Sequence, residues 1–392
     1  MKIGLFTDTY YPQINGVATS VLMLKDNLEK LGHQVYVFTT SDPSINMDEK
    51  NVFRVASLPF RSSRRVGVMY APRLARKIKR LNLDIIHTNT EFPLGIFGRT
   101  MARELNIPHL HTYHTIYEEY THYIVKFGLL DTIAKSAARR LSHNFCNSAD
   151  KVIAPTNKVR DLLLSYHVNK EISVIPTGIN LDKYSIHNYH REEILEIRKS
   201  LGINEDDKVI LYIGRLSEEK NIDELINAME IYLKDKSNTK FVLVGNGPDA
   251  EQLKSLVINK GIANKTIFAG EKPWDEIGKY YQIGDVFVSA SQSETQGLTY
   301  IEALASALPV VAKADRCLEG VVINDINGYT YHSIEEFLLY LDKILSNVQL
   351  WNILSCGAEN SVKQFSALNF AIRIENQYKY LIRNGRLFKK VS

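Results

Sequence analysis

The sequence predicts an α/β protein made of two doubly wound, Rossmann-like domains. Short apolar runs of β-type residues alternate with amphipathic helical stretches from the amino terminus onward, which is typical of a parallel sheet with helices on both faces. A charged, helix-prone stretch interrupts the alternation after residue 182, and the pattern restarts at about residue 208. The length of 392 residues also exceeds what one compact core usually contains, so two domains are expected.

The expected strands follow the apolar runs. In the first half they cover 2–7, 34–39, 52–56, 83–87, 109–114, 152–154 and 172–175, with a helix over 19–31 that ends at Gly32. In the second half they cover 209–214, 240–245, 266–269, 286–290 and 310–312. We therefore expect an N-terminal domain over 1–180, a linker over 181–205, a C-terminal domain over 206–365 and a last helix over 366–392 that packs back on the N-terminal domain. Ligands of such sheets bind beyond the carboxyl ends of the strands, so we expect the ligand in a cleft between two facing domains.

The composition and the amino terminus favour a cytoplasmic protein that does not span a membrane. The three cysteines, Cys146, Cys317 and Cys356, are far apart and odd in number, which is typical of reduced thiols. No stretch of about 18 uncharged apolar residues occurs. The apolar run that follows Met1 is too short for a signal peptide.

Two glutamates, Glu294 and Glu302, flank a predicted helix start at Gly297 and Leu298. Free backbone N–H groups at a helix start favour an anion, and a glycine there lets a phosphate approach the main chain. One carboxylate can then accept hydrogen bonds from the hydroxyls of a sugar and the other from a ribose. The alternative is a loop acid and a solvent-facing helix acid without a ligand.

Two cations follow the first strand of the second half. Arg215 and Lys220 lie between that strand and a predicted helix, where they can neutralise a diphosphate. A solvated loop in which Glu218 and Glu219 are their partners is the alternative. The glycines Gly245 and Gly247 end the next strand, where a nucleobase or ribose can lie against the backbone, although a plain turn would need the same residues.

The first strand–helix connection ends in Asn15 and Gly16, which also suits a phosphate at a helix start. Only one glycine is present there, so the G-x-G-x-x-G fingerprint of a dinucleotide-binding dehydrogenase is missing. An ordinary turn glycine is the alternative interpretation.

His109, His111 and His114 form an H-x-H-x-x-H pattern that resembles a metal-binding motif. No cysteine lies near them in the sequence, and the carboxylates that do are Glu91, Glu118 and Glu119. Because these offer a poor ligand set, we expect no metal, and we expect His114 to be a hydrogen-bonding group in the cleft.

Positive charge is concentrated in the first half. Residues 1–175 contain 23 Lys and Arg against 15 Asp and Glu, and no acidic residue occurs between Lys50 and Leu83. The candidate membrane-binding residues are Arg61, Arg64, Arg65, Arg73, Arg76, Lys77, Lys79 and Arg80. Those from Arg73 onward lie on a basic amphipathic helix whose Leu74, Ile78 and Leu81 face inward or toward lipid. Each cation near an anionic leaflet contributes about 1 kcal/mol. A merely solvated face is the alternative, and no nucleic acid is expected because no recognition motif accompanies the patch.

A second candidate surface covers 117–145. This surface could line the entry of an apolar acceptor. It contains the apolar residues Tyr120, Tyr123, Ile124, Phe127, Leu129 and Leu130 and the cations Lys126, Lys135, Arg139 and Arg140. A buried core helix is the alternative.

Together these motifs resemble the family 4 retaining glycosyltransferases of the GT-B architecture, and the resemblance covers nearly the whole chain. The motifs are Asn15-Gly-Val, His114, Pro176-Thr-Gly-Ile-Asn180, Gly214-Arg-Leu with Lys220, Val244-Gly-Asn-Gly-Pro248 and the pair Glu294 and Glu302. The resemblance implies that Gly16 contacts the diphosphate of a UDP-sugar and that Arg215 and Lys220 neutralise it. It also implies that Glu294 holds the hydroxyls of the donor hexose, Glu302 binds ribose, His114 contacts the donor sugar, and Gly297 and Leu298 offer backbone N–H groups. Gln296 departs from the phenylalanine that many members have at this position.

The segment Glu294-Thr-Gln-Gly-Leu-Thr is similar to that of bacterial diacylglycerol glucosyltransferases. This similarity implies transfer of a hexose, with UDP-glucose as the expected donor, to the free hydroxyl of 1,2-diacylglycerol at the inner face of the cell membrane. The product would be a monoglycosyl diacylglycerol with retained configuration, a candidate anchor for lipoteichoic acid, and no cofactor or metal would be required. The alternatives are another lipid or soluble glycan acceptor, a nucleotide-sugar epimerase, and a non-enzymatic membrane-binding protein on the same scaffold.

Overall fold

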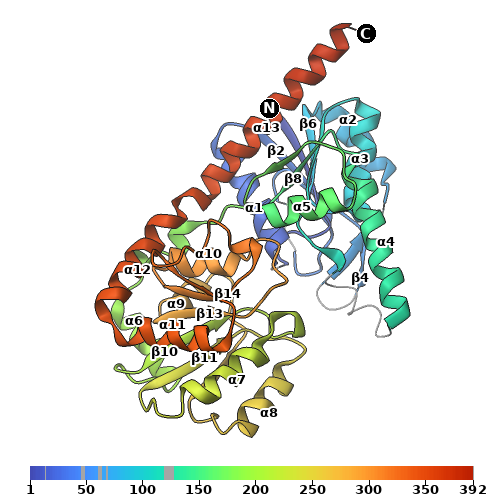
Figure 1. Ribbon diagram of the computed structural model, residues 1–392. Coiled ribbons are helices and arrows are strands. Elements are labelled where there is room, and N and C mark those ends of the chain that lie inside the picture. Colours follow the sequence, from blue (N-terminus) through green and yellow to red (C-terminus); the bar gives the residue numbers. More distant parts are fainter. Residues whose placement is uncertain (14, 46–48, 61–63, 68, 119–127, 392) are drawn as a thin grey trace. The chain divides into compact units, whose positions relative to one another are not determined.

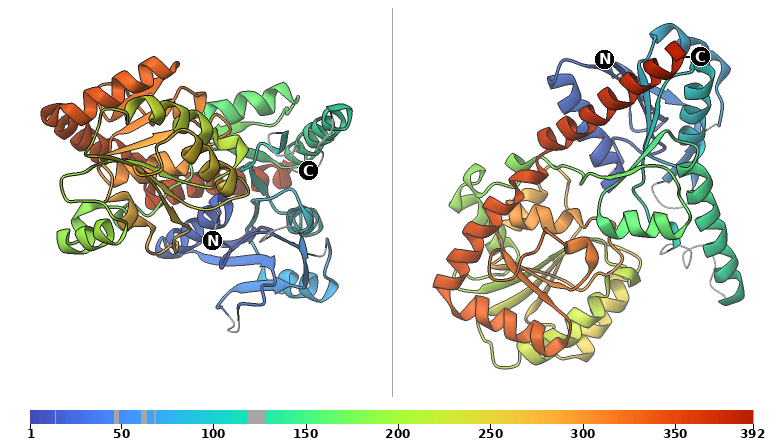
Figure 2. Two further views of the ribbon diagram at one scale, coloured as in Figure 1. Left: turned by 90° about the horizontal axis from the view of Figure 1, so that it is seen from below. Right: turned by 45° about the horizontal axis from the view of Figure 1, so that its top comes forward.

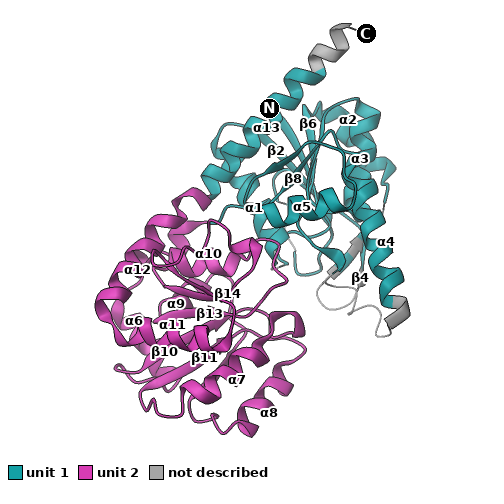
Figure 3. Cartoon of the chain, viewed as in Figure 1, with its two compact units in different colours: residues 1–179, 367–392 teal, residues 180–366 magenta. Residues whose placement is uncertain are grey.

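The computed structural model describes residues 1–13, 15–45, 49–60, 64–67, 69–118 and 128–391. The chain forms two compact units (Figure 3). Unit 1 contains Met1–Ile179 and Ala367–Ser392, and unit 2 contains Asn180–Ser366. Each unit is a parallel sheet with helices packed on both faces (Figure 1), which confirms the predicted fold class.

Unit 1 has a seven-stranded sheet of order β3-β2-β1-β6-β7-β8-β9. The strands are β1 (Lys2–Phe6), β2 (Gln34–Thr40), β3 (Val52–Val55), β6 (Ile85–Thr88), β7 (His109–Thr112), β8 (Lys151–Ala154) and β9 (Ile172–Val174). The helices are α1 (Gly16–Lys30), α2 (Pro72–Leu81), α3 (Pro93–Leu105), α4 (Gly128–Cys146), α5 (Asn157–Ser165) and α13 (Ala367–Val391). Aliphatic side chains of the central strands, such as Ile3 and Ile85, are fully buried and form its core.

A hairpin of β4 (Ser57–Phe60) and β5 (Arg64–Gly67) was not predicted. Its two strands are short and antiparallel, and its arginine-rich sequence lacks the apolar run that marks a buried strand. The hairpin lies outside the parallel sheet, as a sheet of two strands.

Unit 2 has a six-stranded parallel sheet of order β12-β11-β10-β13-β14-β15. The strands are β10 (Lys208–Ile213), β11 (Thr239–Val244), β12 (Thr266–Gly270), β13 (Val286–Ser289), β14 (Val310–Lys313) and β15 (Gly328–Tyr331). The helices are α6 (Arg191–Ser200), α7 (Ile222–Tyr232), α8 (Ala250–Asn259), α9 (Ile277–Tyr281), α10 (Leu298–Ala305), α11 (Ile334–Ser346) and α12 (Val348–Ser361). Strand β15 was not predicted, because its Gly-Tyr-Thr-Tyr sequence is short and only partly apolar.

Residues 181–205 were predicted to be a linker. In the structure they are part of unit 2. Tyr184 is buried there and donates a hydrogen bond to Glu302, and Arg198 of α6 donates to the backbone of Ile283. Charged residues are as frequent as apolar ones in this stretch, so its sequence did not reveal that it packs on the domain.

The last helix, α13, begins at Ala367 and packs along α1 of unit 1 (Figure 2). His33 hydrogen-bonds to Glu375 at 2.9 Å, and the Tyr378 hydroxyl lies 2.7 Å from His87 Nδ1. Among the helices of the described residues, none has the length and apolar character that crossing a bilayer requires.

Candidate functional site

The candidate site residues of unit 2 follow neighbouring strands at one edge of the sheet. The chain runs from β10 outward to β11 on one side and returns to β13 on the other, so the strand order reverses between β10 and β13. Open α/β sheets bind ligands at such a reversal, beyond the carboxyl ends of the strands. Arg215 and Lys220 follow β10, and Glu294 follows β13, so these three side chains flank the reversal.

Lys220 and Glu294 form an ion pair at this position. Lys220 Nζ lies 2.5 Å from Glu294 Oε1, which also accepts a hydrogen bond from Ser291 Oγ at 2.9 Å. The two side chains are 16% and 20% exposed, so both can still be reached from solvent. The structure therefore joins two motifs that lie 74 positions apart in the sequence.

The two loops that carry this pair are also tied by backbone contacts. Ser293 Oγ donates to the backbone oxygen of Glu219 at 3.1 Å, and Asn221 Nδ2 donates to that of Ala290 at 3.2 Å. These contacts fix the loop after β10 against the loop after β13, which holds Lys220 at Glu294.

Arg215 is exposed at the same edge. Its backbone oxygen accepts a hydrogen bond from the hydroxyl of Tyr212, a buried residue of β10, at 3.0 Å. Within the described residues, its guanidinium has neither a hydrogen-bond acceptor nor an ion-pair partner. A planar guanidinium with a fixed backbone and open donors suits a phosphate.

Gly245 and Gly247 are required by the packing of two loops. A Cβ on Gly245 would lie 1.9 Å from the backbone oxygen of Gly214, and one on Gly247 would lie 2.1 Å from that of Leu216. Gly245 also has a φ of 138°, which other residues rarely adopt. The close approach of these loops explains both glycines, and a ligand contact at them stays a prediction.

Gly297 caps the start of α10 in a left-handed conformation with a φ of 70°. A Cβ there would lie 2.3 Å from the ring of Tyr300, so the glycine is needed for this packing. Because the capping residue is a glycine, it has no side chain to cap α10, whose first helical residue is Leu298.

Glu302 lies on α10 and is held by two tyrosines. Its Oε1 accepts from Tyr184 at 2.9 Å and its Oε2 accepts from Tyr281 at 2.7 Å. Burial raises the pKa of Glu302, against the opposing effect of these two donors. The carboxylate is thus not a solvent-facing helix acid, and each of its oxygens keeps a second lone pair that a ribose hydroxyl could use.

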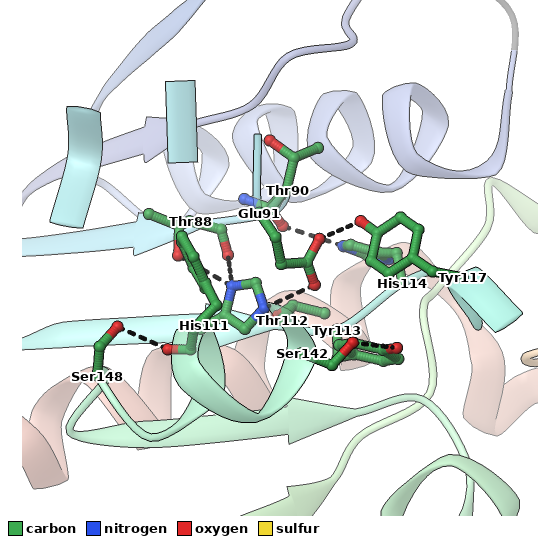
Figure 4. A network of polar contacts seen from close by, with 12 residues as sticks. Thr88, Thr90, Glu91, His111, Thr112, Tyr113, His114, Tyr117, Ser142 and Ser148 are labelled. Carbon is green, nitrogen blue, oxygen red and sulfur yellow. Dashed lines mark hydrogen bonds and ion pairs between the residues drawn. The ribbon is translucent and has the colours of Figure 1, made fainter. Parts of the chain in front are cut away.

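A second group of polar side chains lies at the carboxyl ends of β1, β6 and β7 in unit 1 (Figure 4). Glu91 lies between His111 and Tyr117: His111 Nε2 is 3.1 Å from Glu91 Oε1, and Tyr117 donates its hydroxyl to the other oxygen. His109 and His111 both contact the hydroxyl of Thr88, at 2.9 and 3.0 Å. These histidines are therefore bound to protein groups, and the described part of the chain has no cluster of three or more His, Cys, Asp or Glu placed to hold a metal.

His114 is only partly buried, and its Nε2 lies 3.1 Å from Asn89 Oδ1. Burial lowers the pKa of His114 to about 3, so the ring is neutral at physiological pH. A neutral imidazole has one donor and one acceptor nitrogen, which agrees with the predicted hydrogen-bonding role.

The N-terminus of α1 is already capped by its own sequence. Asn15 Oδ1 accepts from the backbone N–H groups of Val17 and Ala18 at 3.1 and 3.0 Å. Gly16 is exposed at the first position of the helix. The amides of Val17 and Ala18 are thus bound to Asn15, and the predicted contact of a diphosphate with Gly16 stays a prediction.

Asp8, a buried carboxylate, was not predicted from the sequence as a site residue. It accepts from Thr90 Oγ1 at 2.6 Å and from the backbone N–H of Leu94, near the start of α3, at 3.1 Å. Burial raises its pKa from 3.8 to about 6, although both hydrogen bonds act in the opposite direction. A single aspartate after a strand gives no sequence signal that distinguishes it from a turn residue.

Asp8→Asn is expected to raise the free energy of unfolding near pH 7.5. The pKa of the Asp8 carboxyl is higher in the folded than in the unfolded chain, so the folded chain binds this proton more tightly. The contribution of Asp8 to stability therefore falls as the pH rises from about 4 to about 6. The difference in pKa corresponds to at most roughly 3 kcal/mol. Denaturant unfolding of both proteins between pH 4 and 8 measures the effect. If the additional free energy of unfolding of the variant does not shrink toward pH 4, this explanation is refuted.

The cations of α2 are exposed, and its apolar side chains face the core. Ala75 and Ile78 are buried, and Leu74 and Leu81 pack on the same core cluster, so they face inward rather than toward lipid. The exposed cations are Arg73, Arg76, Lys77, Lys79 and Arg80. Of the loop cations, Arg61 and the side chain of Arg64 lie outside the described residues, and Arg65 donates to Ser57.

The second candidate surface is only partly described. Tyr120, Tyr123, Ile124, Lys126 and Phe127, with the side chains of Leu129 and Leu130, lie outside the described residues. Within α4, Ile133 and Leu141 are exposed, whereas Phe145 and Cys146 are buried. The end of α4 thus belongs to the core and its middle lies at the surface; of its cations, Arg139 pairs with Glu118.

Comparisons with known proteins relate the chain to glycosyltransferases. Residues 14–183 match the model of Glycosyltransferase Family 4, and residues 193–360 match that of Glycosyl transferases group 1. An alpha-monoglucosyldiacylglycerol synthase of Streptococcus pneumoniae is 44% identical over 85% of this chain and 75% of its own length. One of Acholeplasma laidlawii is 36% identical over the full length of both.

Solved structures share the fold. Sucrose-phosphate synthase from Thermosynechococcus elongatus superposes with a TM-score of 0.78 over 98% of this chain and 99% of its own, at 22% identity. HepE from Anabaena in complex with UDP superposes with a TM-score of 0.75 over 97% and 100%, at 21% identity. These proteins support the GT-B fold, and the two synthases support the family. The chain therefore belongs to the family of glycosyltransferases that includes the alpha-monoglucosyldiacylglycerol synthases.

Proposed function

We propose that the protein transfers glucose from UDP-glucose to the free hydroxyl of 1,2-diacylglycerol. The observation that carries this proposal is the placement of Lys220, Glu294 and Arg215 at the strand-order reversal of unit 2. Two cations beside a partly exposed carboxylate can bind an anionic diphosphate and a neutral polyhydroxyl group side by side. A UDP-sugar consists of these two parts.

In this proposal the cations act on the leaving group. As the bond between the sugar and the diphosphate breaks, negative charge develops on the diphosphate, and Arg215 and Lys220 stabilise it. Glu294 accepts hydrogen bonds from hexose hydroxyls, and Glu302 accepts from ribose. Because these cations can neutralise the diphosphate, we propose that the reaction needs no metal cofactor, which a titration with a chelator tests.

The names of the relatives support the choice of donor, acceptor and stereochemistry. Both synthases are named for an alpha-glucosyl diacylglycerol product, and HepE has been solved with UDP-glucose. The glucose of UDP-glucose is α-linked, so an α-linked product means retention of configuration. For unit 1, the roles of Gly16 and His114 in donor binding remain predictions from the family resemblance.

The direct test combines the protein with UDP-glucose in the presence and absence of diacylglycerol vesicles, with UDP-galactose in parallel. The expected result is an α-glucosyl diacylglycerol that forms only when lipid is present, with its linkage read by NMR. A new nucleotide sugar without lipid would support an epimerase instead. If turnover occurs only with another lipid or with a soluble glycan, that compound is the acceptor in place of diacylglycerol. Absence of any turnover would refute an enzymatic function.

We propose that the protein acts at the cytoplasmic face of the membrane and is held there peripherally by the exposed cations of α2. Substitution of Arg73, Arg76, Lys77 and Arg80 by Gln is expected to weaken binding to vesicles with anionic lipid, because each cation contributes about 1 kcal/mol at such a surface. Co-sedimentation at low and physiological salt measures the effect.

A matched control makes the same change in charge elsewhere. Lys199, Lys234, Lys254 and Lys363 are exposed on unit 2, and their substitution by Gln is expected to change vesicle binding much less. Equal losses in the two variants would show that net charge, and not the α2 surface, determines binding.

A further inference from the structure

Asn89 and His114 follow neighbouring strands of the unit 1 sheet. β6 and β7 are parallel and paired, so the residues after their carboxyl ends meet at the same edge. The backbone N–H of Asn89 donates to the backbone oxygen of Phe6 at 2.8 Å, which fixes the residue against β1. Only 3% of Asn89 is exposed, and its Oδ1 lies 3.1 Å from His114 Nε2.

His114 differs from the histidines within β6 and β7. His87 binds Tyr378 and Thr112 through its two ring nitrogens, and His111 binds Thr88 and Glu91. His109 contacts Thr88 through Nε2, and it also hydrogen-bonds to the backbone of Ser148. His114 Nδ1, in contrast, has no hydrogen-bond partner among the described residues, so one nitrogen of this ring can reach a ligand.

The amide of Asn89 is also incompletely bonded. Its Nδ2 is buried and has no hydrogen-bond partner in the described part of the chain. A buried donor without a partner costs about 1–3 kcal/mol. An apolar residue of similar size would avoid this cost, so a role for the amide in placing His114 explains why it is buried here.

The geometry points to Asn89 as a positioning residue that holds His114 as the tautomer protonated on Nε2. An amide oxygen accepts, so the Nε2 that faces it must carry the proton. Because the neutral ring has only one proton, Nδ1 becomes an acceptor, and it can receive a hydrogen bond from a hydroxyl of the bound substrate. The tautomer follows from this chain alone; only the identity of the hydroxyl rests on the proposed glycosyl transfer.

The tautomer can be measured without substrate. In ¹⁵N-histidine-labelled full-length protein, the His114→Gln variant identifies the His114 signals. We expect one nitrogen with the shift of a protonated Nε2 and the other with that of an unprotonated Nδ1. Protonation on Nδ1, or a mixture of both tautomers, would overturn the inference, whatever reaction the protein catalyses.

Variants of Asn89 separate the acceptor from the rest of the side chain. Asn89→Asp keeps an oxygen facing Nε2, and we expect it to keep the tautomer. Asn89→Leu removes the acceptor, and we expect a mixture of tautomers and at least about tenfold slower turnover. Asn27→Leu is the matched control, because Asn27 is a buried amide of unit 1 that donates to the Met23 backbone.

The control variant should lose stability without any change in the His114 signals. If Asn89→Leu keeps the wild-type tautomer, or if Asn27→Leu alters it equally, Asn89 does not set it. If the tautomer changes as expected and no glycosyl transfer occurs in any protein, the positioning role stands and the proposed function fails.

Discussion

Replacing Lys220 with alanine is expected to lower turnover at least tenfold. In the free protein Lys220 pairs with Glu294 at 2.5 Å, and with donor bound its ammonium would stabilise the charge that develops on the diphosphate. A hydrogen bond that involves a charged group contributes about 1.5–3 kcal/mol, which corresponds to a factor of roughly 10 to 100 in rate. Initial rates with UDP-glucose and diacylglycerol vesicles, at saturating and limiting donor, measure the loss.

Lys313→Ala is the matched control for this variant. Lys313 ends β14 of the same sheet and forms a comparable, partly exposed ion pair with Glu224. This change should leave the rate within about twofold after correction for the folded fraction. Near-normal turnover of Lys220→Ala, or an equal loss in both variants, would refute the assigned role of Lys220.

Glu294→Gln is expected to have an effect of similar size. The substitution keeps the shape of the side chain but removes its negative charge. That charge attracts Lys220, and it also strengthens hydrogen bonds from sugar hydroxyls. If Glu294 contacts the hexose, the variant should lose roughly 10- to 100-fold in kcat/KM for UDP-glucose. Its affinity for UDP, which lacks the hexose, should change much less, and titration calorimetry with UDP measures this.

Glu224→Gln, which breaks the pair with Lys313, controls for loss of an ion pair in unit 2. The double variant of Lys220 and Glu294 should lose less than the product of the two single effects, because the residues are in contact. Weaker UDP binding by Glu294→Gln, to the same extent as the loss in kcat/KM, would contradict a role at the hexose.

The sequence predicts the parallel sheets well, because buried strands are continuous apolar runs. β10 and β11, for example, lie within one residue of their expected bounds. Strand β15 and the segment that contains Tyr184 were missed, since their burial depends on side chains contributed by distant elements. Tyr184, for example, is buried where its hydroxyl donates to Glu302 of α10 and its ring packs against Tyr281 of α9.

The same limit applies to the candidate site. Arg215 and Lys220 could be selected from the sequence because they follow a predicted strand, and Glu294 because it precedes a predicted helix start. Their mutual contacts could not be predicted, because the ion pair of Lys220 with Glu294 depends on how two loops pack. Asp8 and Asn89 were not selected at all, because burial, rather than any local pattern, sets them apart.

In the proposed reaction, unit 2 binds the diphosphate of a UDP-sugar with Arg215 and Lys220 beside the start of α10. A crystal structure of the full chain with UDP would locate the diphosphate. We expect the diphosphate oxygens within hydrogen-bonding distance of the Arg215 guanidinium, the Lys220 ammonium and a backbone N–H at Gly297 or Leu298. A diphosphate bound elsewhere, with Arg215 and Lys220 making no contact to it, would contradict this binding mode.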